Sequence, residues 1–486
     1  MIIKSTIFYA PAIIAPRAAA FILVLMLTRS LEPSEFGLYA LVVLIGEMLD
    51  MGASNWIRLS MLRSDVSVPG HWRDGLSKSA GLSLIFVALA CLIGLSASFA
   101  IAPAYPIAFA SAVAAYVAAN SSLRLGLSTL QLQGRRLEYS AFESVRAAGL
   151  LASGWLTSTI FPHFWAVAVA NAMVTAAIAS AVLLYSVRKL PKADGVGATY
   201  RSRVAYGFPI VALTFVSYMV ASSDRLFLNL LSGAASVGVY AAAYSIARTP
   251  SDVVGNAINQ GGFPELMRRH DSEGPAGSAE VVRNNFELMS LLQFTILGFS
   301  AGLSSAIVNF LLPPDFRSVA GTLMPVITAA AVCISLKAYV FDGIFHAVRK
   351  NWLQFWTYVP AGLTTVVAAF LLVPPLGALG AALALLTGSF GGLVSSITMS
   401  RRLVKVSLNK RELAKAATLG ITGGGVGHLI WMATPPTWPA FAILMIAGIG
   451  GMGAWVAVGV LVRPSLFQAA FVAIAKIGRR LAPQAG

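Results

Sequence analysis

Charged side chains stand inside long apolar segments of this chain, and they are the residues most able to do chemistry. Residues 222–250, SSDRLFLNLLSGAASVGVYAAAYSIARTP, are mostly apolar yet contain Asp224, Arg225 and Arg248. A charge at the centre of a bilayer costs about 2.5–3.5 kcal/mol on insertion scales. We therefore expect these residues to face a wet interior of the protein, where they bind a ligand or couple to an ion.

Four cations are the predicted substrate-binding residues. Arg17 and Arg248 lie near the centres of their apolar segments, and Arg225 and Lys337 lie in two others. A guanidinium binds phosphate through two parallel hydrogen bonds, so arginines in a membrane cavity favour an anionic ligand, best a phosphate or diphosphate. The pattern therefore predicts a cationic lumen.

Acidic residues share these segments and are predicted to be charge partners or ion-coupling groups. Arg248 and Asp252 are four positions apart, a spacing at which helical side chains can pair. Glu143 and Arg146 are three apart, and we expect that pair only to fix helix packing. The five predicted acids are Asp224, Asp252, Asp342, Glu47 and Asp50.

Other kinds of chemistry find little support. The five histidines are scattered without metal-ligand spacing, and both cysteines lie in apolar runs. There is no phosphate-binding P-loop, and no large outer loop with an acid/base pair. We therefore expect no metal, no cofactor and no enzymatic activity.

The elements that position these charges are predicted to be transmembrane helices. Hydrophobic residues make up 57% of the 486 residues, charged residues 11%, and the mean hydropathy is +0.77; this composition is typical of polytopic membrane proteins. A span needs about 20 mostly apolar residues. About fourteen spans result, near residues 6–28, 36–57, 79–101, 106–124, 141–160, 164–186, 204–226, 236–257, 288–311, 320–346, 354–373, 377–399, 412–432 and 438–462.

The basic residues indicate the orientation. With both termini cytoplasmic, about 28 lysines and arginines fall in cytoplasmic segments and about 2 in the opposite loops, as the positive-inside rule requires. Arg124, at the end of the span 106–124, is counted with the cytoplasmic group. The net charge of +16 follows from this topology, so nucleic-acid binding is not needed to explain it.

Two segments indicate an internal repeat. EFGLYALVVL (35–44) and SVGVYAAAYS (236–245) match at a constant offset, Gly37 with Gly238 and Tyr39 with Tyr240. Each begins the second helix of a predicted six-helix block, so the repeat is parallel, a common transporter plan; the alternative is a chance match. We predict an all-α fold of two six-helix bundles, residues 1–195 and 196–403, followed by two further helices and a cytoplasmic tail, residues 404–486.

Several motifs resemble the polysaccharide-export flippases of the multidrug/oligosaccharidyl-lipid/polysaccharide exporter superfamily. They are LTRSLEPSEFGLYAL (27–41), SSDRLFLNLLSGAASVGVYAAAYSIA (222–247), FPEL (263–266), LLPPDFRSVAGTL (311–323) and VPPLGALGAALALLTGS (373–389). The resemblance implies alternating access and flipping of an undecaprenyl-diphosphate-linked oligosaccharide in the bacterial inner membrane. It also implies arginines in helices 1 and 8, where Arg17 and Arg248 lie. The expected partners are that lipid-linked oligosaccharide, membrane lipid, a polysaccharide polymerase and a chain-length regulator.

Three alternatives stay open. A drug/cation antiporter of the same fold should favour acidic central residues, against which Arg17, Arg248 and Lys337 argue. A membrane polysaccharide polymerase or ligase should have a sizeable outer loop, and the outer loops here are short. A structural scaffold would not need buried charges at matching depths.

Overall fold

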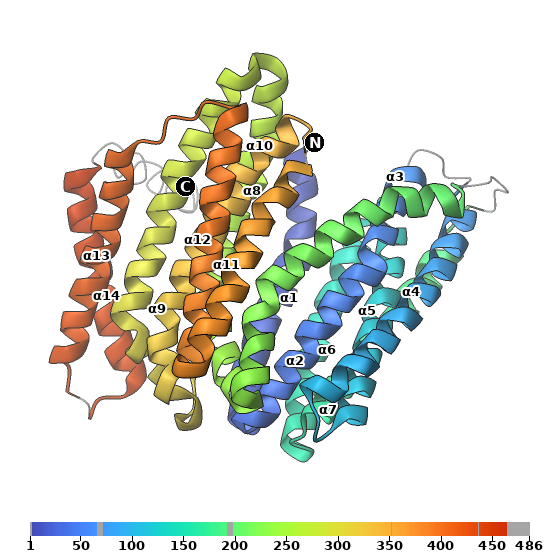
Figure 1. Cartoon of the computed structure of the whole chain (residues 1–486), viewed down its shortest axis with the longest axis horizontal. Helices are drawn as coiled ribbons and strands as arrows, with labels where there is room; N and C mark the ends of the chain where they lie inside the picture. Colours follow the sequence, from blue (N-terminus) through green and yellow to red (C-terminus); the bar gives the residue numbers. More distant parts are fainter. Residues whose placement is uncertain (1, 66–70, 192–197, 351, 436, 464–486) are drawn as a thin grey trace, which may run out of the picture. The chain divides into compact units, whose positions relative to one another are not determined.

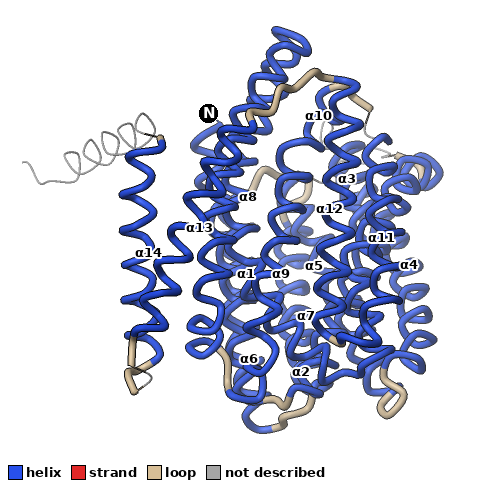
Figure 2. Tube along the Cα trace, turned by 60° about the vertical axis from the view of Figure 1, so that its left-hand side comes forward, coloured by secondary structure: helices blue, strands red, loops and turns tan. Residues whose placement is uncertain are grey.

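The structure is a computed structural model that describes residues 2–65, 71–191, 198–350, 352–435 and 437–463. The described residues are almost entirely helical and contain no strand (Figure 2). All fourteen predicted segments are helical, and two of them include a wider π-helical turn. The predicted all-α polytopic fold is thereby confirmed.

The N-terminal helices begin where the sequence supplies starting signals. Pro33 and Pro106 occupy the first positions of α2 and α5, where a missing backbone N–H costs nothing. The elements of this part are α1 (Ile2–Ser30), α2 (Pro33–Asp50), η1 (Met51–Asn55), α3 (Trp56–Asp65), α4 (Trp72–Ile101), α5 (Pro106–Leu132), α6 (Arg136–Ile160) and α7 (Phe164–Arg188), where η marks a π-helical turn.

The element α8 (Tyr200–Leu311) spans 112 residues but is not one straight rod. A straight helix of that length would measure about 170 Å, several times the thickness of a bilayer. Gly233 and Gly274 have φ values of +81° and +66°, which only glycine adopts readily. The chain of α8 turns at these two points (Figure 1), and three legs, 200–232, 234–273 and 275–311, account for three predicted spans.

The C-terminal helices complete the chain. The third leg of α8 is followed by six further α-helices and a second π-helical turn. They are α9 (Pro314–Leu336), η3 (Lys337–Phe341), α10 (Asp342–Ala347), α11 (Trp352–Leu376), α12 (Ala378–Leu403), α13 (Lys410–Ala433) and α14 (Ala440–Val462).

Nine helices among the described residues are long and apolar enough to cross a membrane. The number is below fourteen because residues 222–311 count once although they contain two complete predicted spans, and because α1, α6, α13 and the predicted span 204–226 are not among the nine. The apolar windows of α4 and α14 are only 17% and 11% buried, whereas that of the α2 segment is 67% buried. We infer that α4 and α14 present their apolar side chains to lipid and that α2 is an interior helix.

The chain divides into two compact units. Unit 1 comprises residues 1–245, 312–320 and 361–388, and unit 2 comprises residues 246–311, 321–360 and 389–486. The predicted boundary between the two six-helix bundles, at residues 195 and 196, lies outside the described residues, and so does most of the predicted cytoplasmic tail. The division into six-helix bundles stays a prediction.

Unit 1 contains a close helix crossing between the two repeat segments. A Cβ placed on Gly37 of α2 would lie 1.9 Å from the carbonyl oxygen of Ala234, and one on Gly238 of α8 would lie 2.0 Å from that of Pro33. Each glycine therefore lies directly against the backbone of the other helix. Ala234 follows Pro33 by 201 positions, as Gly238 follows Gly37, so the contact is reciprocal, as across a two-fold axis. The proposed repeat thus has a geometric counterpart.

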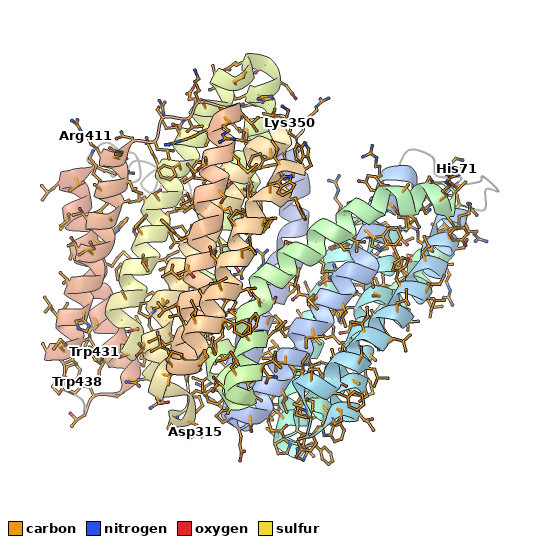
Figure 3. The ribbon with its side chains drawn as sticks, in the orientation of Figure 1. His71, Asp315, Lys350, Arg411, Trp431 and Trp438 are labelled. Atoms are coloured by element: carbon orange, nitrogen blue, oxygen red, sulfur yellow. The ribbon has the colours of Figure 1, made fainter. Side chains whose placement is uncertain are left out.

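In unit 2, α13 packs along α14, and both run together in Figures 1 and 2. Figure 3 shows Lys350 and Arg411 at one end of the helices of this unit and Trp431 and Trp438 at the other. Basic residues at one end and tryptophans at the other are typical of membrane interfaces. Which end faces the cytoplasm stays a prediction.

Candidate functional site

The first cluster of charges, in unit 1, surrounds Asp50 at the end of α2. Its carboxylate is 1% exposed and accepts hydrogen bonds from Ser54 Oγ (2.7 Å), Ser121 Oγ (2.6 Å) and Arg124 Nε (2.6 Å). Ser54 belongs to the π-helical turn η1, which directly follows Asp50, and turns of this kind often mark functional positions. The buried charge is both neutralised and fully hydrogen-bonded, which a stable buried carboxylate requires.

A second cluster, in unit 2, surrounds Asp342 at the start of α10. Its carboxylate accepts from Lys337 Nζ (2.7 Å), Gln354 Nε2 (3.2 Å) and Ser396 Oγ (2.5 Å). The Lys337 ammonium also lies 4.0 Å from the ring centroid of Tyr358. Residues five apart point about 140° away from each other on an α-helix. The π-helical turn η3, which begins at Lys337, removes this offset and brings the pair together.

A third cluster lies on the first two legs of α8 in unit 1. Asp224 is fully buried and accepts a hydrogen bond from Tyr240 Oη at 2.6 Å. The Arg225 guanidinium lies 4.3 Å from the centroid of the Tyr244 ring, with its Nε 3.9 Å from Asp224 Oδ1. Tyr240 is the repeat counterpart of Tyr39, so one member of the repeated motif anchors a predicted site residue. A cation over an aromatic ring is stabilised when it leaves water, which explains how Arg225 is accommodated.

Arg248 and Asp252 form the ion pair that their spacing predicts. Arg248 Nε lies 2.9 Å from Asp252 Oδ2, and the two side chains are 28% and 34% exposed. One turn further along α8, the amide of Asn256 donates to the carbonyl oxygen of Asp252 (2.6 Å) and to Tyr339 Oη (2.9 Å). A pair that is one-third exposed contributes little to stability, so its charges can exchange partners at small cost.

Arg17 differs from the other predicted cations. Its side chain is exposed on α1 in unit 1, and among the described residues it has no ionic partner. Glu47 is half-buried on α2, one turn before Asp50. The structure thus brings together Lys337 with Asp342, Arg248 with Asp252, and Asp224 with Arg225. It gives Arg17 and Glu47 no contact with another predicted site residue within unit 1.

Arg124 is the functional candidate that the sequence analysis misplaced. The predicted span ended at Arg124, whereas α5 continues for eight residues beyond it, to Leu132. The span was predicted to end at residue 124 because the charge of Arg124 lowers the mean hydropathy of the segment around it. The available signal was Asp50, an acid in the middle of a predicted span, which requires a buried cation on a neighbouring helix.

Taken together, the geometry can bind an anion but offers no catalytic arrangement among the described residues. Asp50 and Asp342 are each already neutralised by a cation of their own unit. Arg17 carries a charge that no described acid cancels, and the ion pair of Arg248 with Asp252 is partly exposed. Site roles for all of these residues stay predictions.

Comparison with known proteins gives a family and a fold. Residues 26–320 match the model of a family described as polysaccharide biosynthesis protein. No curated protein matches the chain by sequence.

Three solved structures are similar in fold. The lipid II flippase MurJ in an inward closed conformation superposes with a TM-score of 0.73 at 11% identity, over 95% of this chain and 99% of that one. A transporter of the MOP superfamily from Pyrococcus furiosus, whose binding pocket has reverse polarity, gives 0.57 at 11% identity over 82% and 95%. An inward-facing multidrug resistance transporter of the MATE family gives 0.54 at 12% identity over 79% and 93%. At these identities the likeness shows the fold alone.

Proposed function

Because the chain belongs to the polysaccharide biosynthesis protein family, we propose that it flips an undecaprenyl-diphosphate-linked oligosaccharide repeat unit across the bacterial inner membrane. The match over residues 26–320, more than half of the chain, is the observation that carries this proposal. The MurJ-like polytopic fold supports it. The protein transports its substrate and does not convert it chemically.

The physical problem of such a substrate is its head group. Each hydroxyl of a sugar costs several kcal/mol when it is transferred bare into an alkane-like medium, and a diphosphate costs more. The polyprenyl tail, in contrast, is stable in lipid. A flippase must therefore offer the head group a wet, cationic path while the tail stays in the bilayer.

Arg17 and Arg248 are the proposed binding residues for the diphosphate. Arg17 is exposed and has no ionic partner among the described residues, and Arg248 is held by a pair that is about one-third exposed. An incoming diphosphate replaces Asp252 as the partner of Arg248 without uncovering a buried charge. Alternating access then moves the head group, and the membrane potential supplies about 2.3 kcal/mol per charge per 100 mV. Lys337 and Arg225 are secondary candidates because each is already engaged with an acid and an aromatic ring.

The test follows lipid-linked oligosaccharide in cells that lack the gene. We expect the surface polysaccharide to be lost and complete repeat units to accumulate on the cytoplasmic leaflet. Arg17→Ala and Arg248→Ala should each fail to restore export when expressed at wild-type level. Arg73→Ala is the matched control, since it removes an exposed arginine of α4 that the proposal does not use, and it should restore export.

Two results would replace the proposal. If single repeat units collect on the outer leaflet, the protein is a polymerase or ligase. If no lipid-linked sugar accumulates and only sensitivity to cationic drugs rises, it is an antiporter of the same fold. The antiporter is not favoured at Asp50 and Asp342, because these acids are already neutralised by Arg124 and Lys337 and offer no open negative charge to a cationic drug.

A further inference from the structure

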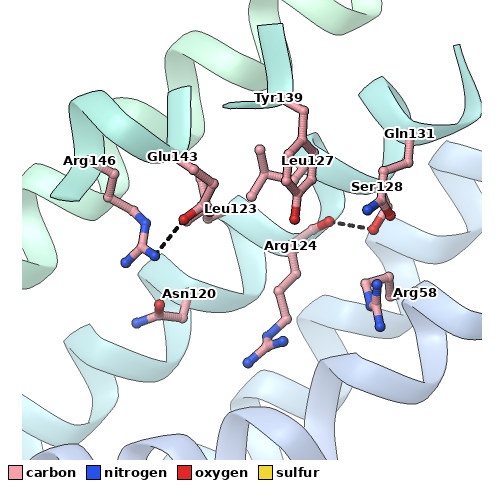
Figure 4. A pocket seen from close by; sticks show the side chains of 10 residues that line it. All are labelled: Arg58, Asn120, Leu123, Arg124, Leu127, Ser128, Gln131, Tyr139, Glu143 and Arg146. Atoms are coloured by element: carbon pink, nitrogen blue, oxygen red, sulfur yellow. Dashed lines mark hydrogen bonds and ion pairs between the residues drawn. The ribbon is translucent and has the colours of Figure 1, made fainter. Parts of the chain in front are cut away.

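A small polar cavity lies within unit 1, among helices α3, α5 and α6. Its volume is about 270 Å³, and Figure 4 shows three arginine side chains around it, each from a different helix. They are Arg58 of α3, Arg124 of α5 and Arg146 of α6. None of the three was among the predicted binding residues. Three cations around one cavity need an explanation, because like charges repel in a medium of low dielectric constant.

The neighbouring acids cancel only part of this charge. Arg124 binds Asp50 through Nε, and Arg146 binds Glu143 through one terminal nitrogen at 2.7 Å. Arg58 has no carboxylate partner among the described residues; its Nε donates only to the amide oxygen of Asn55, at 3.4 Å. Two of the three guanidiniums are thus paired directly with a carboxylate and that of Arg58 is not, and Glu47 adds a further negative charge that acts on Arg124 from a distance.

Hydrogen-bond donors are also left over. A guanidinium has five N–H donors, and the contacts within the described residues use a minority of those on Arg58, Arg124 and Arg146. Nε of Arg146 is buried and has no hydrogen-bond partner among the described residues. A buried, charged donor without an acceptor costs free energy that a bound acceptor would recover.

The remaining wall is mixed, with polar groups beside the apolar side chains of Leu123 and Leu127. Asn120 and Gln131 of α5 and Tyr139 of α6 line the cavity between the arginines. Cavities that hold drug-sized ligands have volumes of about 300–1,000 Å³ and are mostly apolar. This one is smaller and cationic, so it fits one compact oxyanion and excludes a complete lipid-linked oligosaccharide.

We propose that this cavity is a second anion site, which binds one phosphoryl group between Arg58, Arg124 and Arg146. A phosphoryl group presents three acceptor oxygens in different directions, which suits donors that come from three helices. The group comes either from free phosphate or from the head group of an anionic lipid. The inference rests on unit 1 alone and does not depend on the substrate of transport.

The first experiment measures binding of inorganic phosphate to the purified full-length protein in detergent by calorimetry. Arg58→Gln should weaken binding at least about tenfold, the factor expected from losing one hydrogen bond to a charged group. Arg58 is the right position because it neutralises no described acid, so its removal leaves no buried carboxylate behind. Arg73→Gln makes the same charge change at an exposed site of α4 and should bind as the wild type does.

A second variant keeps the proposal testable if Arg58→Gln does not fold. Gln131→Glu keeps the shape of the side chain and adds a negative charge to the cavity wall, so it should also weaken phosphate binding at least about tenfold. Restoration of export is measured for the same variants, so that loss of phosphate binding with intact export can be told apart from loss of transport. This contrast separates failure of the anion site from failure of the proposed transport.

A second experiment identifies the source of the phosphoryl group. Native mass spectrometry is applied to protein taken from bilayers of phosphatidylglycerol or of phosphatidylcholine. If the ligand is a lipid head group, the wild type should retain phosphatidylglycerol and Arg58→Gln should not. Binding of inorganic phosphate that depends on Arg58 indicates the free anion. If neither ligand binds, or if Arg58→Gln and Arg73→Gln behave alike in both experiments, the proposal is wrong.

Discussion

The crossing of α2 and α8 at Gly37 and Gly238 predicts how much stability the protein loses when either glycine is replaced. Replacing Gly37 with alanine puts a Cβ 1.9 Å from the carbonyl oxygen of Ala234, and replacing Gly238 puts one 2.0 Å from that of Pro33. The obstructing atom is backbone in both cases, so no side-chain rotation relieves the clash. Either substitution forces the two helices apart.

The size of the effect follows from the geometry. Ordinary contact of a Cβ begins at 3.4 Å, so the backbones must separate by about 1.5 Å, the difference between 3.4 and 1.9 Å. Overpacking of a well-packed interior typically costs 1–3 kcal/mol. Because a helix backbone must move here, we expect about 3 kcal/mol for each substitution, similar for both because the contact is reciprocal.

Thermal unfolding of the purified protein in detergent measures this cost, and restoration of export in cells lacking the gene measures its consequence. The matched control is Gly453→Ala on α14, where a Cβ meets nothing within 4 Å; it should unfold at or slightly above the wild-type temperature, since alanine favours helix. Wild-type stability of Gly37→Ala would refute the close crossing. A loss of stability in only one of the two glycine variants would refute the reciprocity of the crossing.

Three further predictions concern buried contacts, all measured by thermal unfolding in detergent. Arg124→Gln leaves the buried carboxylate of Asp50 without a cation and should cost about 3–5 kcal/mol, and adding Asp50→Asn should recover part of the loss. Lys337→Met should destabilise unit 2 in the same way, with recovery when Asp342→Asn is added; equal losses in single and double variants would argue against both pairs. Gly420→Ala puts a Cβ 2.2 Å from the backbone of α8 and should loosen α13, whereas wild-type stability would contradict that packing.

Much of the helical organisation could be predicted from the sequence because hydropathy is a local signal. All fourteen predicted segments are helical, since a run of about 20 apolar residues in lipid must satisfy its backbone internally. The repeat motif was also visible, because Gly37 and Gly238 recur in the same context. That these two glycines lie against each other's helices was not visible, since a helix crossing is a contact across 201 positions of sequence.

The contacts of the charges were harder to predict. Arg248 and Asp252 pair as predicted, since α-helical spacing determines their proximity. Lys337 and Asp342 pair through a π-helical turn, for which the sequence has no reliable signal. Arg124 is 74 positions from Asp50, and its charge itself ended the predicted span too early. Local periodicity thus predicts pairs within one α-helix and misses those that depend on tertiary packing.

The ion pairs also decide which cations can be removed without a loss of stability. Lys337 and Arg124 are needed where they are, because a buried carboxylate would otherwise lose its counter-charge at a cost of several kcal/mol. Arg17 and Arg58 form no ion pair with a described acid, and Arg248 is paired with a partly exposed Asp252. Binding of an anion at any one of these three arginines should therefore leave the buried pairs intact. The prediction is that Arg17→Ala and Arg248→Ala impair export and that Arg58→Gln impairs phosphate binding, all without lowering the unfolding temperature, whereas Lys337→Met and Arg124→Gln lower it. Loss of stability in the first group would show that those arginines hold the fold together instead.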